Sequence, residues 1–345
     1  MMSLKVRLKY IIKNNLLFKS KTQHVKVLAI GVDCPSDLLI LTDFFQIKRS
    51  SITFQNNFKP HLEEAEALGF KCSIECKDKH DLIILAIPND KKEALGLVSK
   101  SLKIIKEEGY IVFDGQKSIG IESIVNKLSF LNFTLISKAH GKLVLAPKPK
   151  TIPHSVEEWD NASQLSLNRN NFLTSPGMFS YKKIDSGSEL LGNFLGTNIK
   201  GQVADLCSGW GYLSIIALEK NSKIKKVCLF EANYAALMAS KQNLKDPRAC
   251  FHWEDVINLP DQEKKFDFVI CNPPFHSKAK YDILQGRKVI KTGCNILKFT
   301  GSFLMVANKH LPYEKHLRNY FSNVDKMTET PYFKVFRATK PIFNR

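Results

Sequence analysis

Residues 266–275 read Phe-Asp-Phe-Val-Ile-Cys-Asn-Pro-Pro-Phe, and this stretch decides the fold of the second half of the chain. The apolar run 266–271 predicts a strand that is buried on both faces, as strands of parallel sheets are. Pro273 and Pro274 end the strand, because proline cannot donate to a neighbouring strand. In α/β sheets, ligands bind at the carboxyl ends of the strands. The Asn272 amide, the carbonyl of Pro273 and the ring of Phe275 together suit a planar amino group.

Strands and helices alternate on both sides of this stretch. Such alternation predicts an α/β fold with a doubly wound, mainly parallel sheet. The expected strands are 201–206, 226–230, 249–252, 266–271 and 302–307, and the expected helices are 212–220, 234–244 and 282–297.

The first half of the chain repeats this plan, with apolar strands expected at 25–30, 51–55, 81–88 and 111–113. Shared strand composition is the alternative explanation, but the order and the offsets agree across four elements. We therefore predict two tandem domains, 1–160 and 161–345, joined near a Pro-rich and polar break at 147–170. The first copy has Ala86 and Ile87 in place of Asn272 and Pro273, and Gln55 in place of Glu231. It is expected to be a degenerate domain that has lost the site and keeps only the fold.

The composition indicates a globular protein with a polyanionic partner. The 345 residues carry a formal net charge of +18, which favours nucleic acid. A general lysine-rich bias is the alternative. The basic, amphipathic N-terminal stretch suits a solvated helix face or an RNA-contacting arm better than an organelle import signal. No apolar run reaches the roughly 18–20 residues of a membrane span, and no secretory signal is evident.

The eight cysteines are scattered and lack the paired spacing of a zinc site, so we expect no metal and free thiols, which suit the reducing cytoplasm. We also expect a monomer.

Residues 203–211 (Val-Ala-Asp-Leu-Cys-Ser-Gly-Trp-Gly) join a strand to a helix and predict a ligand loop. Gly209 and Gly211 allow the backbone to approach a ligand, and a helix N-terminus offers free N–H groups. A plain tight turn is the alternative, and the full dinucleotide pattern of a nicotinamide site is absent. Glu231 ends the next strand and could bind both hydroxyls of a ribose, or act as a helix N-terminal acid. Asp255 could face an adenine amino group, or could cap a turn.

Taken together, these segments resemble class I S-adenosylmethionine-dependent methyltransferases. The resemblance is closest to the ribosomal RNA guanine-N2 methyltransferases of the RsmC type. It rests on residues 174–180, 185–191, the Asp205 loop, 272–276, 306–313 and 333–338. The chain departs from the family pattern at Cys207, where glycine is usual, and at Glu231, where aspartate is common. The resemblance implies tandem Rossmann-like methyltransferase domains and S-adenosylmethionine as cofactor. It implies a cofactor site made of Asp205, Cys207, Gly209, Gly211, Glu231, Asp255, Val256 and Phe179.

The resemblance implies methyl transfer to the exocyclic N2 of a guanine in small-subunit (16S) ribosomal RNA, either as naked RNA or within a ribosomal subunit. The first domain would then serve RNA positioning or stability. The Asn272 side-chain oxygen and the Pro273 carbonyl would accept the two amine hydrogens. The substrate contacts expected next to this amide are stacking by Phe275, a relay or RNA contact by His276, and phosphate contacts by Lys334 and Arg337. The same chemistry would serve large-subunit RNA, adenine N6 or a protein amide. An inactive RNA-binding relative is the remaining alternative.

Overall fold

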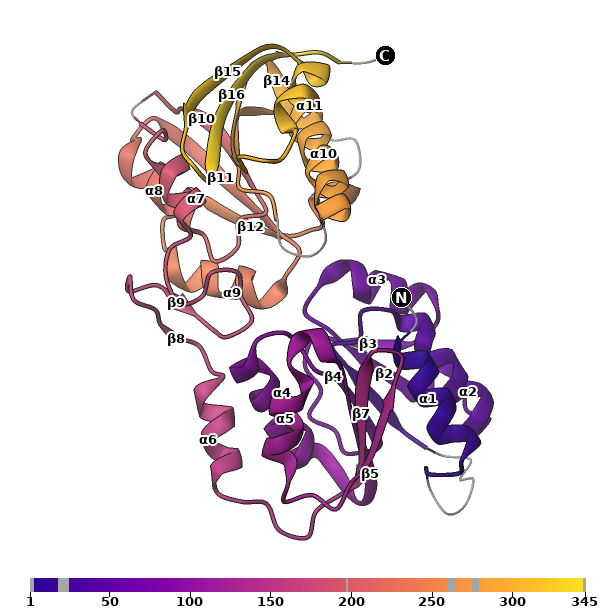
Figure 1. The fold of residues 1–345 in the computed structure, drawn as a ribbon. Helices are drawn as coiled ribbons and strands as arrows, with labels where there is room; N and C mark the ends of the chain where they lie inside the picture. Colours follow the sequence, from indigo (N-terminus) through magenta and orange to yellow (C-terminus); the bar gives the residue numbers. More distant parts are fainter. Residues whose placement is uncertain (1–2, 18–24, 197, 260–264, 275–278, 344–345) are drawn as a thin grey trace. The chain divides into compact units, whose positions relative to one another are not determined.

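A computed structural model describes residues 3–17, 25–196, 198–259, 265–274 and 279–343. The chain divides into two compact units (Figure 1). Unit 1 comprises Met1–Leu165 and Ser175–Gly177, and unit 2 comprises Ser166–Thr174 and Met178–Arg345. Each unit is built on its own seven-stranded sheet. A two-stranded sheet of β8 (Ser166–Leu167) and β9 (Leu173–Thr174) lies in unit 2.

The sheet of unit 2 has the strand order β12-β11-β10-β13-β14-β16-β15. The first five strands in this order are parallel, and β16 runs antiparallel to both of its neighbours. Their bounds are β10 (Gly201–Leu206), β11 (Ile224–Glu231), β12 (Ala249–Trp253), β13 (Phe266–Cys271), β14 (Leu297–Asn308), β15 (Phe321–Glu329) and β16 (Phe333–Pro341).

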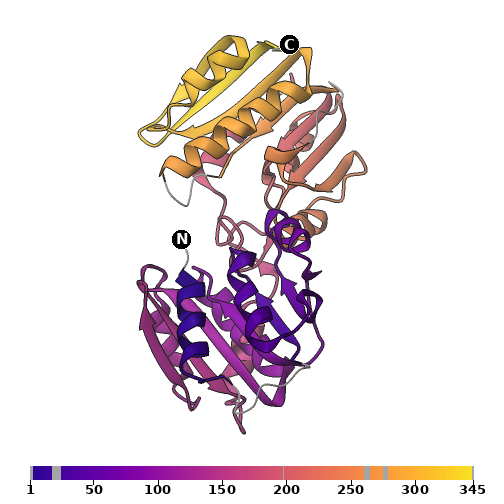
Figure 2. The same ribbon diagram turned by 90° about the vertical axis from the view of Figure 1, so that its right-hand side faces the viewer.

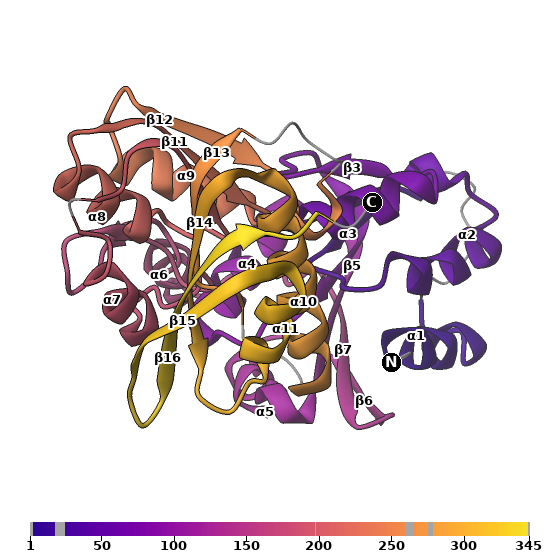
Figure 3. The same ribbon diagram turned by 90° about the horizontal axis from the view of Figure 1, so that it is seen from above.

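Helices cover both faces of this sheet. Figure 3 shows α7 (Ser186–Gly192) and α8 (Tyr212–Lys220) on one side of the strands and α10 (Ala279–Ile296) and α11 (Tyr313–Tyr320) on the other. In Figure 2, α10 and α11 lie side by side over the yellow strands. Helix α9 (Tyr234–Asn243) packs against β11 and β12. Two apolar cores result, one on each face, because alternate strand residues point to opposite sides.

The sequence-based bounds of three elements, β10, α8 and β13, agree with the structure. The strand expected at 302–307 is longer, because β14 pairs with β16 from Ser302 to Asn308 and continues back to Leu297. The helix expected at 282–297 begins at Ala279 and ends at Ile296.

Unit 1 has the same topology, with the strand order β3-β2-β1-β4-β5-β7-β6. The prediction of two tandem domains on one plan is therefore confirmed. The strands are β1 (Val27–Ile30), β2 (Ile52–Gln55), β3 (Lys71–Ser73), β4 (His80–Ala86), β5 (Ile105–Gln116), β6 (Thr134–Lys138) and β7 (Gly141–Pro147). The α-helices are α1 (Ser3–Lys13), α2 (Leu39–Phe45), α3 (Lys59–Ala67), α4 (Lys91–Ile104), α5 (Ile121–Val125) and α6 (Ser155–Ala162).

The expectation of free thiols throughout the chain is wrong for one pair. Cys228 and Cys250 form a disulfide. They lie opposite each other in the register of β11 and β12, with their Cα atoms 4.7 Å apart, which is within the range that a disulfide spans. Separately, among the described residues no helix combines the length and the apolar character that crossing a bilayer requires.

Candidate active site

The candidate site lies where the strand order of unit 2 changes direction. Strand β10 is flanked by β11 on one side and β13 on the other, and Leu206 lies opposite Cys271. The loops that follow β10 and β13 therefore begin side by side, at the kind of crevice where doubly wound sheets bind ligands. A pocket here is lined by side chains and loop residues that include Phe179, Asp185, Ser188, Cys207, Gly209 and Asn272.

The Asn272 amide is held in one orientation. Its Nδ2 donates to Asp185 Oδ2 at 2.9 Å and to Ser188 Oγ at 2.7 Å. Its Oδ1 is buried and has no hydrogen-bond partner among the described residues. A buried amide oxygen without a partner is costly, which indicates that a ligand completes the site. Pro273 is buried and Pro274 is exposed. Phe275 and His276 lie outside the described residues.

The loop after β10 bends through left-handed backbone conformations. Cys207, Gly209 and Gly211 have φ angles of +60°, +55° and +95°. A side chain at Gly209 would meet no atom within 4 Å, so the backbone there borders open space. Cys207 occupies a conformation that favours glycine and lines the pocket.

Glu231 closes this loop from the end of β11. Its Oε2 accepts from the Gly209 backbone N–H at 2.8 Å, and its Oε1 accepts from the Asn233 N–H at 2.8 Å. Burial raises the pKa of Glu231, whereas these backbone hydrogen bonds oppose the rise. Each carboxylate oxygen has a second lone pair, so the bound carboxylate can still accept from ligand hydroxyls.

Asp205 lies beneath the loop and does not line the pocket. It is fully buried, and its Oδ2 accepts from Ser214 Oγ on α8 at 2.7 Å. Its Oδ1 has no partner among the described residues. Burial, with a contribution from the Glu231 carboxylate, raises the pKa of Asp205 to about 7. The position suits support of the loop.

Asp255 caps the short 3₁₀ helix Val256–Asn258, in agreement with the alternative role that the sequence predicts. Its Oδ1 accepts from the Ile257 N–H at 3.2 Å, and its Oδ2 accepts from Asn258 Nδ2 at 2.9 Å. The side chain of Val256 is buried in the core under α10, and its carbonyl accepts from Thr292 Oγ1 at 2.8 Å.

Phe179 and Trp210 form one wall of the pocket. The Trp210 indole N–H donates to the Phe179 carbonyl at 3.0 Å. The ring centroid of Trp210 lies 4.9 Å from that of Phe172, so its bulk is largely packed within the fold. The Phe179 side chain is 42% exposed at the pocket.

Lys334 and Arg337 are not neighbours in space. They are three residues apart on β16, so their side chains leave opposite faces of the sheet. Lys334 lies opposite Ala307, near the edge where β14 ends, whereas Arg337 lies opposite Leu304 in the middle of the strand. Arg337 Nη2 donates to Ser302 Oγ at 3.4 Å.

The sequence assigns no role to three residues that the structure places at the candidate site: Asp185, Ser188 and Ser214. The first two belong to the segment 185–191 that resembles the family. Asp185 caps α7 by accepting from the Ser188 N–H at 2.8 Å, and an Asp three residues before a Ser is an ordinary cap pattern. The contact of this cap with Asn272 spans 87 positions of sequence and has no local signal.

The family described as "Methyltransferase small domain" matches residues 169–337. The ribosomal RNA small subunit methyltransferase C of Photorhabdus laumondii is 30% identical over 263 residues, which cover 75% of this chain and 77% of the relative. The chain belongs to this methyltransferase family. Its relative of the same name from Psychromonas ingrahamii is 28% identical over 329 residues, covering 94% of this chain and 93% of that protein.

A solved structure has a similar fold, and the similarity extends over most of both units of this chain. The Thermus thermophilus 16S rRNA N2 G1207 methyltransferase (RsmC), in complex with AdoMet and guanosine, matches with a TM-score of 0.75 and 19% sequence identity. The match covers 91% of this chain and 87% of that chain.

Proposed function

We propose that the protein transfers a methyl group from S-adenosylmethionine to the exocyclic N2 of a guanine in small-subunit (16S) ribosomal RNA. Family membership supports the reaction class, because the curated relatives are named ribosomal RNA small subunit methyltransferases. The observation that carries the proposal is Asn272 Oδ1, a buried acceptor without a protein partner among the described residues, in the pocket beside the β10 loop.

The residues of the pocket fit the cofactor. Gly209 borders open space, Ser208 Oγ is a second buried polar atom without a described partner, and Glu231 holds a carboxylate beside the loop. We assign the ribose hydroxyls to Glu231 and the methionine end to residues 207–209, with Phe179 over the bound molecule. When bound, S-adenosylmethionine supplies an electrophilic methyl group on a sulfonium centre.

The protein's own groups then orient the amine. Asn272 Oδ1 accepts one hydrogen of guanine N2, and the Pro273 carbonyl accepts the other. Both acceptors favour the positive charge that develops on N2 during transfer. The proton that N2 loses afterwards passes to solvent, so no side chain has to act as a base beforehand. The assignments of Phe275 to base stacking and of His276 to the same edge stay predictions from the sequence.

We further propose a division of labour between the units. Unit 2 carries the reaction, and unit 1, which lacks the site residues, positions RNA or stabilises the chain. The net charge of +18 suits a substrate bound through its phosphates. We retain Lys334, at the edge of the sheet that bears the pocket, as a phosphate contact. Arg337 lies in the middle of β16, away from this edge. Its position therefore supports a phosphate contact less well than that of Lys334. We propose that the protein acts in the cytoplasm, where its RNA substrate is made. We further propose that it acts as a monomer.

The test is methyl transfer from labelled cofactor to small ribosomal subunits of a strain that lacks this protein, followed by mapping of the labelled base. We expect label on N2 of one guanine. The Asn272→Ala variant should lose transfer by about 10²-fold or more while keeping its affinity for the cofactor.

Asn323→Ala, an exposed position on β15, is the matched control and should transfer like the parent. Large ribosomal subunits and DNA are offered in parallel reactions, and label found only there, or only in ribosomal protein, would overturn the substrate. Full activity of the Asn272 variant would overturn the proposed site.

A further inference from the structure

We propose that Asp185 and Ser188 are positioning residues that force the Asn272 side chain to present its oxygen, and not its NH₂ group, to the substrate amine. The inference rests on the proposed function and deepens it. An asparagine amide can turn by half a rotation and exchange its oxygen and nitrogen. Only the oxygen can accept a hydrogen from an amino group, so the rotation decides whether the site works.

The contacts of Asn272 remove this freedom. Its two N–H groups are used by Asp185 Oδ2 and Ser188 Oγ, at 2.9 and 2.7 Å. An ionised carboxylate can only accept hydrogen bonds, so it must face the nitrogen of the amide and not its oxygen. The bond is charge-assisted and hence stronger than one between neutral groups. Oδ1 is consequently left at the pocket, buried and without a described partner.

Helix α7 fixes the clamp itself. The same Asp185 oxygen accepts the Ser188 backbone N–H at 2.8 Å, so the carboxylate is both the N-cap of the helix and the partner of Asn272. Hydrogen bonds in a chain polarise one another, which makes Oδ1 a better acceptor than a free amide oxygen.

The decisive variant is Asp185→Asn. Asparagine is as good a helix cap as aspartate, so α7 should persist. Its amide can donate as well as accept, so Asn272 can turn and face the substrate amine with its own N–H groups. We expect kcat to fall by about 10²-fold, with KM for S-adenosylmethionine within about twofold of the parent, since the loss is confined to one preorganised contact.

Two further variants complete the test. Ser188→Ala removes one of the two acceptors and should lower kcat by about tenfold through the same loosening. Asp90→Asn is the matched control, because Asp90 caps α4 in unit 1 by accepting from the Lys92 and Glu93 N–H groups. It should leave kcat unchanged.

The outcomes separate this inference from the proposed function. Parental kcat in Asp185→Asn, beside an inactive Asn272→Ala, would overturn the clamp and leave the site intact. A loss of kcat that follows a matching loss of thermal stability and cofactor affinity would show a merely structural cap, and would also overturn it. Full activity in Asn272→Ala would fail the proposed function instead.

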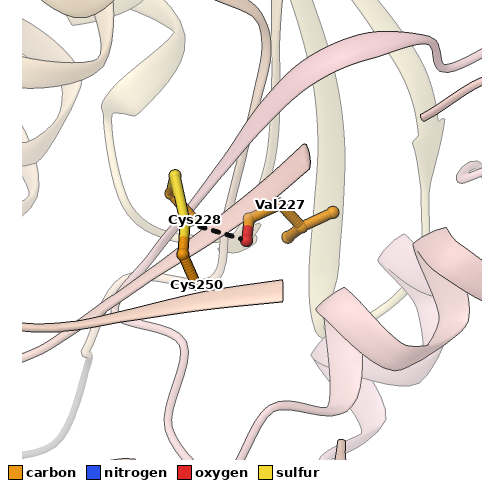
Figure 4. The surroundings of a disulfide bond; sticks show 3 residues. All are labelled: Val227, Cys228 and Cys250. Atoms are coloured by element: carbon orange, nitrogen blue, oxygen red, sulfur yellow. Dashed lines mark hydrogen bonds between the residues drawn. A yellow bond between two sulfur atoms is a disulfide. The ribbon is translucent and has the colours of Figure 1, made fainter. Parts of the chain in front are cut away.

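A different observation leads to a second proposal. We infer that Cys228, Cys250 and His252, once the disulfide is reduced, form a binding site for a soft divalent cation, represented by Zn²⁺. Figure 4 shows the two cysteines joined across β11 and β12. His252 follows Cys250 by two residues on β12, so both side chains lie on one face of the sheet. The Sγ atoms and an imidazole nitrogen all lie within 4.8 Å of one another.

Neighbouring side chains restrain the position of the proposed histidine ligand. The His252 ring stacks on Phe230, with centroids 4.7 Å apart and the planes 14° from parallel, which restrains the imidazole. Two cysteines and one histidine form a common zinc donor set, in which a water molecule can take the fourth position.

The chemistry requires a reductant. A dithiol transfers two electrons and two protons to the disulfide, which gives two Cys thiols and the oxidised dithiol. Binding of Zn²⁺ then releases the two thiol protons, and the two thiolates balance the charge of the ion. The disulfide and the metal therefore exclude each other.

The test uses the full-length protein, reduced with dithiothreitol and freed of it without oxygen, then incubated with Zn²⁺ and passed over a desalting column. We expect one zinc per chain by mass spectrometry of the metal, and none in the oxidised protein. Cys250→Ser and His252→Ala should each lose it, and Cys34→Ser, a free half-buried cysteine of unit 1, should keep it. Equal zinc in the parent and Cys250→Ser, or none in the reduced parent, would overturn the proposal.

Discussion

Buried polar atoms without a hydrogen-bond partner indicate where a ligand can bind to this protein. Of the four buried side-chain oxygens that have no hydrogen-bond partner among the described residues, three are Oδ1 of Asn272, Oγ of Ser208 and Oδ1 of Asp205, and the fourth is Oγ of Ser99 in unit 1. Leaving such a group unpaired costs about 1–3 kcal/mol. The first two line one pocket and the third lies beneath it, so the cost is concentrated where a bound molecule can supply partners.

Cys207 carries backbone strain that a glycine would remove. Its φ is +60°, and Gly31, at the corresponding place directly after β1 in unit 1, has φ +65°. We expect Cys207→Gly to stabilise unit 2 by about 1 kcal/mol, seen as a higher urea midpoint, because left-handed backbone is unfavourable for residues with a β-carbon. Cys72→Gly, in the extended strand β3, should instead destabilise. A lower midpoint for Cys207→Gly would contradict this account.

Asp205 should make stability depend on pH. Its pKa is raised to about 7 by burial, so the folded protein holds a proton that the unfolded chain releases near pH 4. Stability is therefore fully present below about pH 4 and falls as the pH rises to about 7, by at most about 4 kcal/mol at about 1.36 kcal/mol per pH unit. Asp205→Asn should lose less stability than the parent between pH 5 and pH 8, in urea titrations without cofactor. Identical pH profiles would refute the role of Asp205.

At the scale of elements, the site is the meeting of α7, the β10–α8 loop and the end of β13. Helix α7 supplies the cap that holds Asn272, and β11 supplies the carboxylate that holds the loop. None of these elements is unusual in its own local structure. They come together because the sheet order places β10 between β11 and β13.

Two glycines of the loop should separate folding from binding. A Cβ at Gly211, with φ +95°, would lie 3.1 Å from Ser240 Cβ on α9, whereas one at Gly209, with φ +55°, would meet nothing within 4 Å. We expect Gly211→Ala to lower the free energy of unfolding by about 1–3 kcal/mol. Gly209→Ala should cost less stability but weaken cofactor binding more, because its methyl group enters the open space. Urea unfolding and calorimetric titration measure the two effects, and the reverse ranking would contradict the assignment.

At the scale of the whole molecule, one plan was used twice, and the candidate site lies in the second copy. Leu206 lies opposite Cys271, and Ile30 lies opposite Leu85, so Ala86 takes the place of Asn272. The Gln55 side-chain oxygen at the end of β2 accepts the Cys76 N–H at 2.9 Å. Unit 1 thus keeps the fold. The side chain at the position that corresponds to Glu231 is used by a contact within unit 1.

The chain should consequently bind one cofactor molecule and not two. Calorimetric titration of the full chain with S-adenosylmethionine should give a stoichiometry of one. Gly209→Ala should weaken that single event, while Gln55→Ala in unit 1 should leave it unchanged. A stoichiometry of two would show that unit 1 retains a working site.

The sequence alone determined the fold class, the duplication and the loop and strand end that face the pocket. These features are local: the period of apolar residues, glycines before a helix and two prolines after a strand are visible within a dozen positions. The bounds of β10, α8 and β13 followed from them directly.

Only the tertiary structure decided which distant side chains act together. The bond of Asp185 to Asn272 and the pairing of Cys228 with Cys250 both depend on strand register and helix placement. Register is set by packing over the whole sheet, and a shift of one residue would reverse every face. No local pattern records it, which is why these partners emerged from the structure and not from the sequence.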